Sequence, residues 1–208
     1  MEDTFQWSEE KIEQLNRLMA YYRCAIMEIE TKFNVLNEEF SLQYDRNPIS
    51  SIKTRLKNMR SIKEKLERKG LPLTVESIET NLKDVSGVRV ICAFQQDVYT
   101  LADALLRQDD ITFVSRKDYI KNPKPNGYRS LHLIVQVPIF LAKETRVMNV
   151  EIQLRTIAMD SWASLEHQLR YKKDFDFTEE MEKELLYCAK LSTELDEKMD
   201  GLRRGVNF

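Results

Sequence analysis

The sequence predicts an α+β domain in which a small mixed sheet is flanked by helices from both ends of the chain. Apolar residues recur at steps of three or four up to about residue 70. They alternate within several segments between residues 88 and 155, and return to helical steps after residue 156. The 208 residues, 42% of them hydrophobic, suffice for one domain with a buried core.

The elements follow in order from this spacing. The chain is expected to begin with a helix over residues 8–40, a turn over 45–48 and a second helix over about 49–69 that ends at Gly70. The remaining elements are a short helix over 74–82, a strand over 88–94, a helix over 97–107, a strand near 111–119, a loop over 123–127, strands over 129–138 and 146–155, and helices over 156–171 and 177–204.

The terminal helices carry more apolar surface than a small sheet needs to cover. The stripe on the last helix comprises Leu185, Leu186, Ala189, Leu191 and Leu195. We therefore expect one domain over residues 1–208, with its core at about 45–172 and with flanks at 8–40 and 177–204 that form a homo-oligomer.

The composition excludes several classes of protein. No apolar run approaches the roughly 20 residues needed to span a bilayer, and no signal peptide opens the chain, so we expect a cytoplasmic protein with no membrane partner. The three cysteines, Cys24, Cys92 and Cys188, are expected to be buried free thiols. Only two histidines are present, which disfavours zinc.

Charge is distributed unevenly along the chain. Eight basic residues stand against two acidic ones from Lys53 to Lys69, and ten acidic against three basic from Asp174 to Asp200. This asymmetry indicates a local anion site rather than general affinity for DNA, RNA or membrane. Two solvated helix faces are the simpler alternative.

The basic segment, taken as a helix, gathers a set of polar residues on an arc of about 80°. Such a set suits a triphosphate, by charge pairing and hydrogen bonding. Arg55 projects elsewhere, where its guanidinium could stack on a nucleobase, and Arg89 could supply a second plane. No Walker-type glycine loop is present, so side chains would hold the phosphates. The residues on the arc are Lys57, Ser61, Lys65 and Arg68.

The strand over 146–155 has one apolar face and one polar face, the latter with Asn149, Glu151, Gln153 and Arg155. Alone, the polar face is more simply explained by solvent. If the strand over 129–138 pairs with it, His132 joins the same face. Glu151 could then bind Mg²⁺ beside substrate phosphates or accept a proton from a hydroxyl.

Three further residues are candidates, each with an ordinary structural alternative. Asp84 precedes Gly87 and could be a second metal ligand, although Asp-x-x-Gly also describes a common turn. Tyr128 could stack on a base or could be a half-buried aromatic at a strand start. Asp160 could accept hydrogen bonds from the N1–H and amino group of guanine, which adenine cannot donate.

Several of these segments together resemble the RelA/SpoT alarmone enzymes. Lys117-Asp118-Tyr119-Ile120 and Pro123 to His132 resemble the synthetase-domain loop, Val150 to Thr156 the acidic catalytic strand, and Asp84 to Arg89 the metal-binding turn. The resemblance covers roughly residues 45–172. The chain is most similar to the small alarmone synthetases of the RelP/RelQ type, with RelP the nearer.

The resemblance implies a nucleotidyltransferase-like fold and transfer of pyrophosphate from ATP to the 3′-hydroxyl of GDP or GTP, as in the stringent response. Arg55 and Arg89 would sandwich adenine. Mg²⁺ would be bound by Asp84 and Glu151, with Glu151 also the base. The ATP phosphates would be held by Lys57, Ser61, Lys65 and Arg68. The guanine nucleotide would be held by Lys117, Lys124, Asn126, Tyr128, His132, Gln153, Arg155 and Asp160.

The resemblance also implies a tetramer, and it leaves two alternatives open. One is a toxin that pyrophosphorylates the 3′ end of tRNA; the other is a noncatalytic sensor of nucleotides or RNA. The paired carboxylates argue against the sensor. The long family members carry a hydrolase built around a His-Asp pair, whereas neither His132 nor His167 precedes Asp here. We expect a synthetase without hydrolase activity, and regulation by RNA is not indicated.

Overall fold

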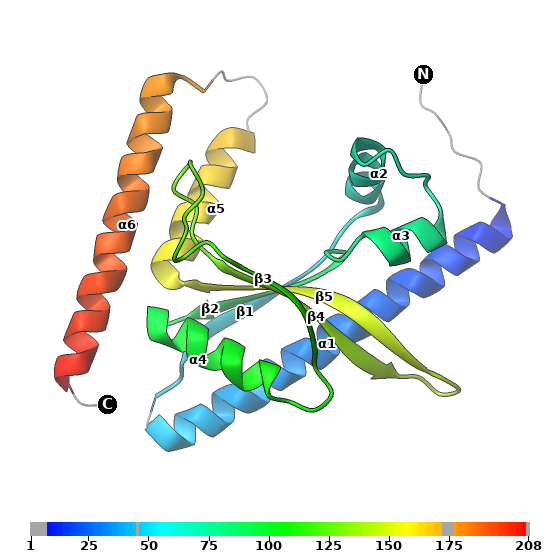
Figure 1. Ribbon diagram of the computed structural model, residues 1–208, viewed down its shortest axis with the longest axis horizontal. Helices are drawn as coiled ribbons and strands as arrows, with labels where there is room; N and C mark the ends of the chain where they lie inside the picture. Colours follow the sequence, from blue (N-terminus) through cyan, green and yellow to red (C-terminus); the bar gives the residue numbers. More distant parts are fainter. Residues whose placement is uncertain (1–7, 45, 172–176, 207–208) are drawn as a thin grey trace.

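A computed structural model describes residues 8–44, 46–171 and 177–206. Five strands form one mixed sheet in the order β1-β2-β5-β4-β3, in which only β2 and β5 run parallel. The helices lie around it (Figure 1), which confirms the predicted fold class. The elements are α1 Glu9–Tyr44, β1 Ile49–Leu56, α2 Met59–Arg68, α3 Val75–Asn81, β2 Ser86–Cys92, α4 Gln95–Leu106, β3 Thr112–Asp118, β4 Leu131–Phe140, β5 Thr145–Thr156, α5 Ile157–Tyr171 and α6 Glu179–Val206.

The long helix α1 runs along one face of the sheet and forms the main core with it (Figure 1). Tyr22, Ile29 and Phe33 on α1 are almost completely buried and belong to the same apolar cluster as Val90 and Ile152 of the sheet. Burial of each such side chain contributes about 1.5–3 kcal/mol. The first flank is therefore part of the domain core, and the opposite sheet face is left for polar residues.

The expectation of one helix over 49–69 is wrong in its first half. Ile49–Leu56 is a strand paired with β2, and the helix starts only at Met59. Asn58 caps α2 by accepting a hydrogen bond from Ser61 N at 2.8 Å. Because Ile52 and Leu56 precede Met59 at helix-compatible steps, apolar spacing alone did not separate the two elements. The backbone pairing with β2 makes residues 49–56 a strand.

The other boundaries agree with the expectations to within a few residues. Thr74 caps α3 through Ser77 N, and Gly70, with φ of 67°, follows α2 in the left-handed region that favours glycine. Residue 45 and residues 172–176, which include parts of the predicted turn and of the acidic run, lie outside the described residues. Within the described ranges, no helix combines the length and apolar character that a bilayer crossing requires.

The cysteines do not all behave as expected. Cys92 is buried and Cys24 is half-buried, but Cys188 is exposed. Cys188 lies on α6 beside Leu191, at the edge of an apolar groove between α5 and α6. The apolar stripe on α6 that predicted burial is only partly covered within this chain.

Candidate active site

Residues from all five strands form a polar row on the sheet face opposite α1. The register places Lys53, Arg89, Gln153, His132 and Lys117 side by side, one from each strand. Residues in register point to the same side of a sheet. The pairing of β4 with β5, and with it the shared polar face of His132 and Gln153, is confirmed.

Glu151 lies in the next row of this face, where its carboxylate is held by two neighbours. His132 Nδ1 is 3.5 Å from Oε1, and Gln153 Nε2 donates to Oε2 at 3.0 Å. Burial acts to raise the pKa of Glu151, but the hydrogen bonds and charge of His132 and the bond from Gln153 outweigh it and hold the pKa below its ordinary value. Glu151 is therefore ionised at neutral pH.

Asp84, just before β2, is held by two lysines. Lys57 Nζ and Lys65 Nζ each donate to its Oδ2 at 2.5 Å. Burial acts to raise the pKa of Asp84, yet the hydrogen bonds and charges of Lys57 and Lys65 prevail and lower it. The other oxygen, Oδ1, is buried without a hydrogen-bond partner. An ionised carboxylate with an unpaired buried oxygen fits a cation, because such an oxygen is costly to leave unpaired.

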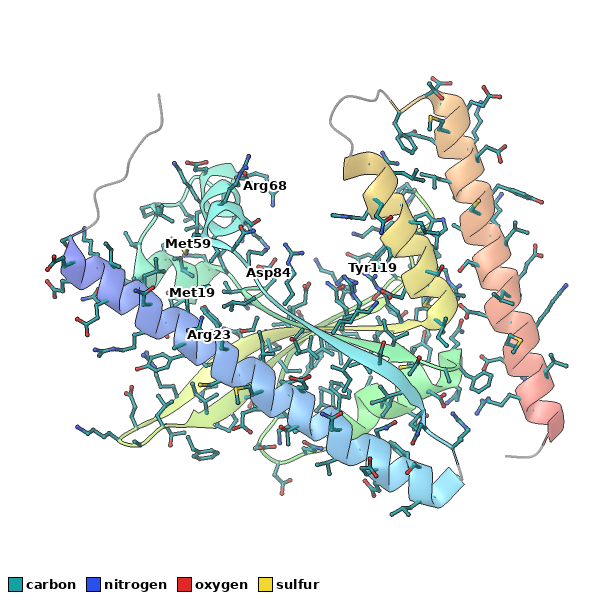
Figure 2. All side chains as sticks on the ribbon, turned by 180° about the vertical axis from the view of Figure 1, so that it is seen from behind. Met19, Arg23, Met59, Arg68, Asp84 and Tyr119 are labelled. Atoms are coloured by element: carbon teal, nitrogen blue, oxygen red, sulfur yellow. The ribbon has the colours of Figure 1, made fainter. Side chains whose placement is uncertain are left out.

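Asp84 and Glu151 together line two neighbouring cavities, of about 330 Å³ and about 450 Å³. In Figure 2, Asp84 lies below Arg68 of α2, and Tyr119 lies across from it on the side toward α5. No group of three or more metal-ligating side chains occurs in the described part of the chain. Two carboxylates match the usual protein contribution to Mg²⁺, since that ion takes its other ligands from water and phosphates.

The smaller cavity is lined by Arg55, Lys57 and Arg89 from the set expected to hold ATP. Lys65 lines the larger cavity instead, whereas Ser61 and Arg68 on α2 line neither. The four residues do not share a helix face as expected, because Lys57 precedes α2. Lys57 N instead bonds Val85 O at 2.9 Å, which brings its side chain to Asp84.

The larger cavity is lined by Lys117, Lys124 and His132 from the set expected to hold the guanine nucleotide. Tyr128 Oη lies 2.9 Å from His132 Nε2. Lys124 Nζ lies over the Tyr128 ring at 4.8 Å and over the Tyr119 ring at 4.9 Å. Tyr119 lines the cavity and Tyr128 lies beside it, so cations and aromatic rings are combined here, which suits a phosphorylated base.

Tyr119 was not assigned a role from the sequence. Its ring meets those of His132 and Tyr128 edge-on, with centroids 5.3 Å and 6.0 Å apart. An aromatic residue at the end of a strand, two positions after Lys117, was the available signal. The signal could not be interpreted from the sequence, because only the fold shows that the segment after β3 places Tyr119 next to the start of β4.

Asp160, near the start of α5, is buried and links the two halves of the site. Its Oδ2 accepts from Lys53 Nζ at 2.8 Å, and its Oδ1 accepts from Arg155 at 3.1 Å and Arg89 at 3.3 Å. Arg155 also donates to Tyr128 Oη at 2.6 Å and to Gln153 Oε1 at 3.0 Å. In this structure the carboxylate expected to bind guanine is paired with three cations.

Lys53 was also missed, because the helical interpretation of residues 49–69 hid it. In a strand, the alternation of Lys53, Arg55 and Lys57 places the three side chains on one face. The structure confirms that all three line the smaller cavity. Strand β1, rather than a helix, therefore supplies most of the cationic wall.

Asn126 lines neither cavity and instead shapes the loop before β4. Its Oδ1 accepts from Tyr128 N at 3.2 Å, and its Nδ2 donates to Glu166 Oε1 on α5 at 3.4 Å. Asn126 thus orients Tyr128, and direct contact with a nucleotide stays a prediction.

Comparison with known proteins identifies the family to which a chain with this site belongs. Residues 54–176 match the model of the region found in RelA/SpoT proteins. The chain is 42% identical to GTP pyrophosphokinase YwaC of Bacillus subtilis, over 92% of this chain and 91% of YwaC. It is 35% identical to GTP pyrophosphokinase YjbM of the same organism, over 93% and 90%.

A solved structure agrees in fold as well. The small alarmone synthetase 1 of Bacillus subtilis, bound to its product pppGpp, superposes with a TM-score of 0.85 at 35% identity, covering 94% of this chain and 100% of that one. The mixed sheet, its helices and the paired carboxylates are thus accompanied by similarity along nearly the whole chain. This chain belongs to the RelA/SpoT family, within the group of small alarmone synthetases.

Proposed function

We propose that the protein is a GTP pyrophosphokinase that transfers pyrophosphate from ATP to the 3′-hydroxyl of GDP or GTP, forming (p)ppGpp and AMP. One observation carries the proposal: two ionised carboxylates, Asp84 and Glu151, lie on the wall that two cationic cavities share. A reaction between two phosphorylated nucleotides needs two anion sites that meet at one centre. The names of the relatives YwaC and YjbM support the same reaction.

The smaller cavity holds ATP in this proposal. Arg55 and Arg89 line it and offer planar guanidinium groups for stacking on adenine. Lys57 and Lys65 are close to the centre at Asp84, where the phosphates must lie. Ser61 and Arg68 on α2 are assigned to the outer phosphates.

The larger cavity holds the guanine nucleotide. Tyr128, which lies beside the cavity next to His132, stacks on the base, while Lys117, Lys124 and His132 in the cavity pair with phosphates. Arg155 and Gln153 support Tyr128 and Glu151 from below, through the hydrogen bonds described above. Asp160 contacts the guanine edge only after releasing one of its cations, Lys53 being the most exposed of the three.

Asp84 and Glu151 would hold Mg²⁺, which would supply positive charge to neutralise the phosphates of the reacting nucleotides. Lys57 and Lys65 then leave Asp84 and pair with the ATP phosphates, whose charge replaces that of the carboxylate. Glu151, ionised at neutral pH, accepts the proton of the 3′-hydroxyl. Positioning of the two nucleotides supplies the larger part of the lowering of the activation barrier, about 7–11 kcal/mol.

The proposed function is tested by incubating the protein with Mg²⁺, ATP labelled in its β-phosphate, and GDP, GTP or deacylated tRNA. We expect label transfer to GDP or GTP, with equimolar AMP. Transfer to tRNA alone would instead show the toxin activity. Nucleotide binding without AMP release for any acceptor would show a noncatalytic sensor.

We further propose that the protein is a cytoplasmic homo-oligomer, and specifically a tetramer. A groove of about 690 Å³ between α5 and α6 supports this, because it is lined mainly by apolar side chains. Leu165, Leu191 and Leu195 in this groove are each about half exposed. A second copy of the same chain would cover them.

A further inference from the structure

The C-terminal helix α6 packs directly against the loop that carries Tyr128, here called the acceptor loop (residues 123–130). Gly127 in this loop has φ of 87°, and a Cβ built on it would lie 2.4 Å from Ala189 Cβ on α6. Trp162 of α5 donates to Leu185 O of α6 at 2.9 Å beside this contact. The path of the acceptor loop therefore depends on where α6 lies.

A buried ion pair forms a second link between α6 and the acceptor loop. Arg129 donates to Asp196 Oδ2 at 3.0 Å, and the two residues are 6% and 7% exposed. Thr156 Oγ1 donates to the same oxygen at 3.0 Å and accepts from Met159 N in the first turn of α5. Arg129 also donates to Gln95 at 2.8 Å. Asp196 thus joins α6 directly to the acceptor loop and to the end of β5, and Arg129 and Thr156 extend the link to α4 and α5.

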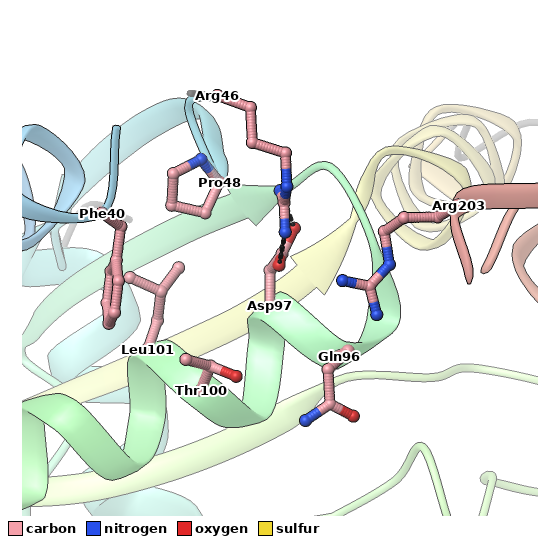
Figure 3. Close-up of a pocket in the computed structure, with 8 residues that line it drawn as sticks. All are labelled: Phe40, Arg46, Pro48, Gln96, Asp97, Thr100, Leu101 and Arg203. Atoms are coloured by element: carbon pink, nitrogen blue, oxygen red, sulfur yellow. Dashed lines mark hydrogen bonds and ion pairs between the residues drawn. The ribbon is translucent and has the colours of Figure 1, made fainter. Parts of the chain in front are cut away.

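The end of α6 is fixed as well. The Arg203 guanidinium lies 5.4 Å from the centre of the Phe94 ring, and the Arg46 guanidinium lies 5.3 Å from the same ring. Figure 3 shows Arg203 facing the ion pair of Arg46 and Asp97 across a cavity of about 180 Å³. Contacts at Ala189, Asp196 and Arg203 therefore fix the position of α6 along its length.

Adjacent residues of the acceptor loop connect these contacts to the site. Tyr128 is turned toward His132 and Arg155, whereas Arg129 is turned toward Asp196 on α6. A buried ion pair stabilises little by itself, but removing one partner leaves an uncompensated charge. The backbone at residue 129 is therefore confined by α6, and with it the ring at residue 128.

We propose that Asp196 is a positioning residue for the guanine nucleotide, and that α6 holds the acceptor loop in its binding conformation. The inference rests on the proposed function, in which Tyr128 binds the acceptor. It gives α6 a role in the active site of its own chain, in addition to any role in oligomerisation. The ATP cavity is lined mainly by residues of β1, β2 and β5, and by none of α6 or the acceptor loop.

The first test compares Asp196→Asn with Glu197→Gln, the same chemical change at an exposed position on the same helix. We expect Asp196→Asn to raise the KM and the calorimetric Kd for GDP or GTP about tenfold or more, since small displacements at a site are costly. The KM for ATP and all constants of Glu197→Gln are expected to stay at their wild-type values. Equal losses for both nucleotides, or an unchanged acceptor constant, would overturn the proposal.

The second test uses the contact between Gly127 and α6. It tests the role of α6 even if the Asp196→Asn variant does not fold. Gly127→Ala should weaken GDP or GTP binding, and adding Ala189→Gly should restore part of it by removing the clash. Absence of any recovery would refute the role of α6. Binding by calorimetry needs no turnover, so a wild-type protein that releases no AMP would reject the proposed function while leaving this comparison valid.

Discussion

At the scale of single residues, the centre of the site consists of two carboxylates kept ionised in different ways. Glu151 is held by its neighbours on the sheet face, His132 and Gln153. Asp84 is held by Lys57, which directly follows β1, and by Lys65 of α2. Both carboxylates line both cavities, but only Glu151 lies on a strand of the sheet, where its carboxylate is 3.5 Å from His132.

We predict that Glu151→Gln lowers kcat by about 10²–10⁴-fold, the range that general-base catalysis contributes, while the Kd values for ATP and GDP change little. The amide keeps the size of the side chain but cannot accept the proton. AMP release and calorimetry measure the two effects, with the exposed Glu67→Gln as control. Turnover near the wild-type level would remove Glu151 from the reaction.

The lysines at Asp84 predict a dependence of stability on pH. The folded-state pKa of Asp84 lies below its unfolded value of about 3.9, so the carboxylate stabilises the fold above that pH and loses this contribution as the pH falls toward the folded pKa. Lys65→Met should raise the folded pKa and make this loss smaller. Urea unfolding of both proteins between pH 6 and pH 3 measures it; identical losses in both would contradict the assignment.

Sequence patterns could identify the residues of β5, because Glu151, Gln153 and Arg155 alternate with apolar neighbours in a single strand. They could not identify Tyr119 or the partners of Asp160. Those contacts join elements that are far apart in the sequence, and the spacing of residues within one element does not predict them. The role of Lys53 could have been predicted from the sequence, but only if residues 49–56 were interpreted as a strand.

At the scale of elements, the boundary between β1 and α2 places the cationic wall. Most elements were predictable because their apolar periods were unambiguous and their ends carried ordinary signals, such as Thr74 and Gly70. The segment over 49–69 fits a helical period throughout, so only two local features distinguish its halves: the β-branched residues Ile49, Ile52 and Thr54, and Asn58 before Met59. The tertiary pairing with β2 then selects the strand.

We predict that the cap of α2 is needed for stability and for ATP binding. Asn58→Ala removes the acceptor for Ser61 N and should cost about 1 kcal/mol in the free energy of unfolding. It should also weaken ATP binding, because Lys65 on α2 becomes less well placed. Asn58→Asp keeps the acceptor and serves as the matched control. Equal unfolding midpoints for the Ala and Asp variants in urea would show that the cap is unimportant.

At the scale of the whole molecule, the two terminal helices differ in what they leave exposed. Helix α1 buries its stripe against the sheet, whereas α6 buries Ala189 and Asp196 and leaves Leu191, Leu195 and Met199 about half exposed. The sequence showed an apolar excess on the last helix but could not divide it between a contact within the chain and a contact with another copy. The structure assigns the first part, and the groove between α5 and α6 is where the proposed contact with another copy would form.

The groove leads to a prediction about assembly. We expect light scattering at micromolar concentration to give a multiple of the 24.6 kDa chain mass, and Leu195→Glu to lower it, because a charge in a buried apolar contact is costly. Leu42→Glu changes an exposed leucine on α1 that does not line the groove, and should leave the mass unchanged. A monomeric wild-type mass would reject the assembly. If Leu195→Glu is monomeric yet keeps its GDP affinity, α6 supports the acceptor loop within one chain, as the buried pair of Arg129 and Asp196 requires.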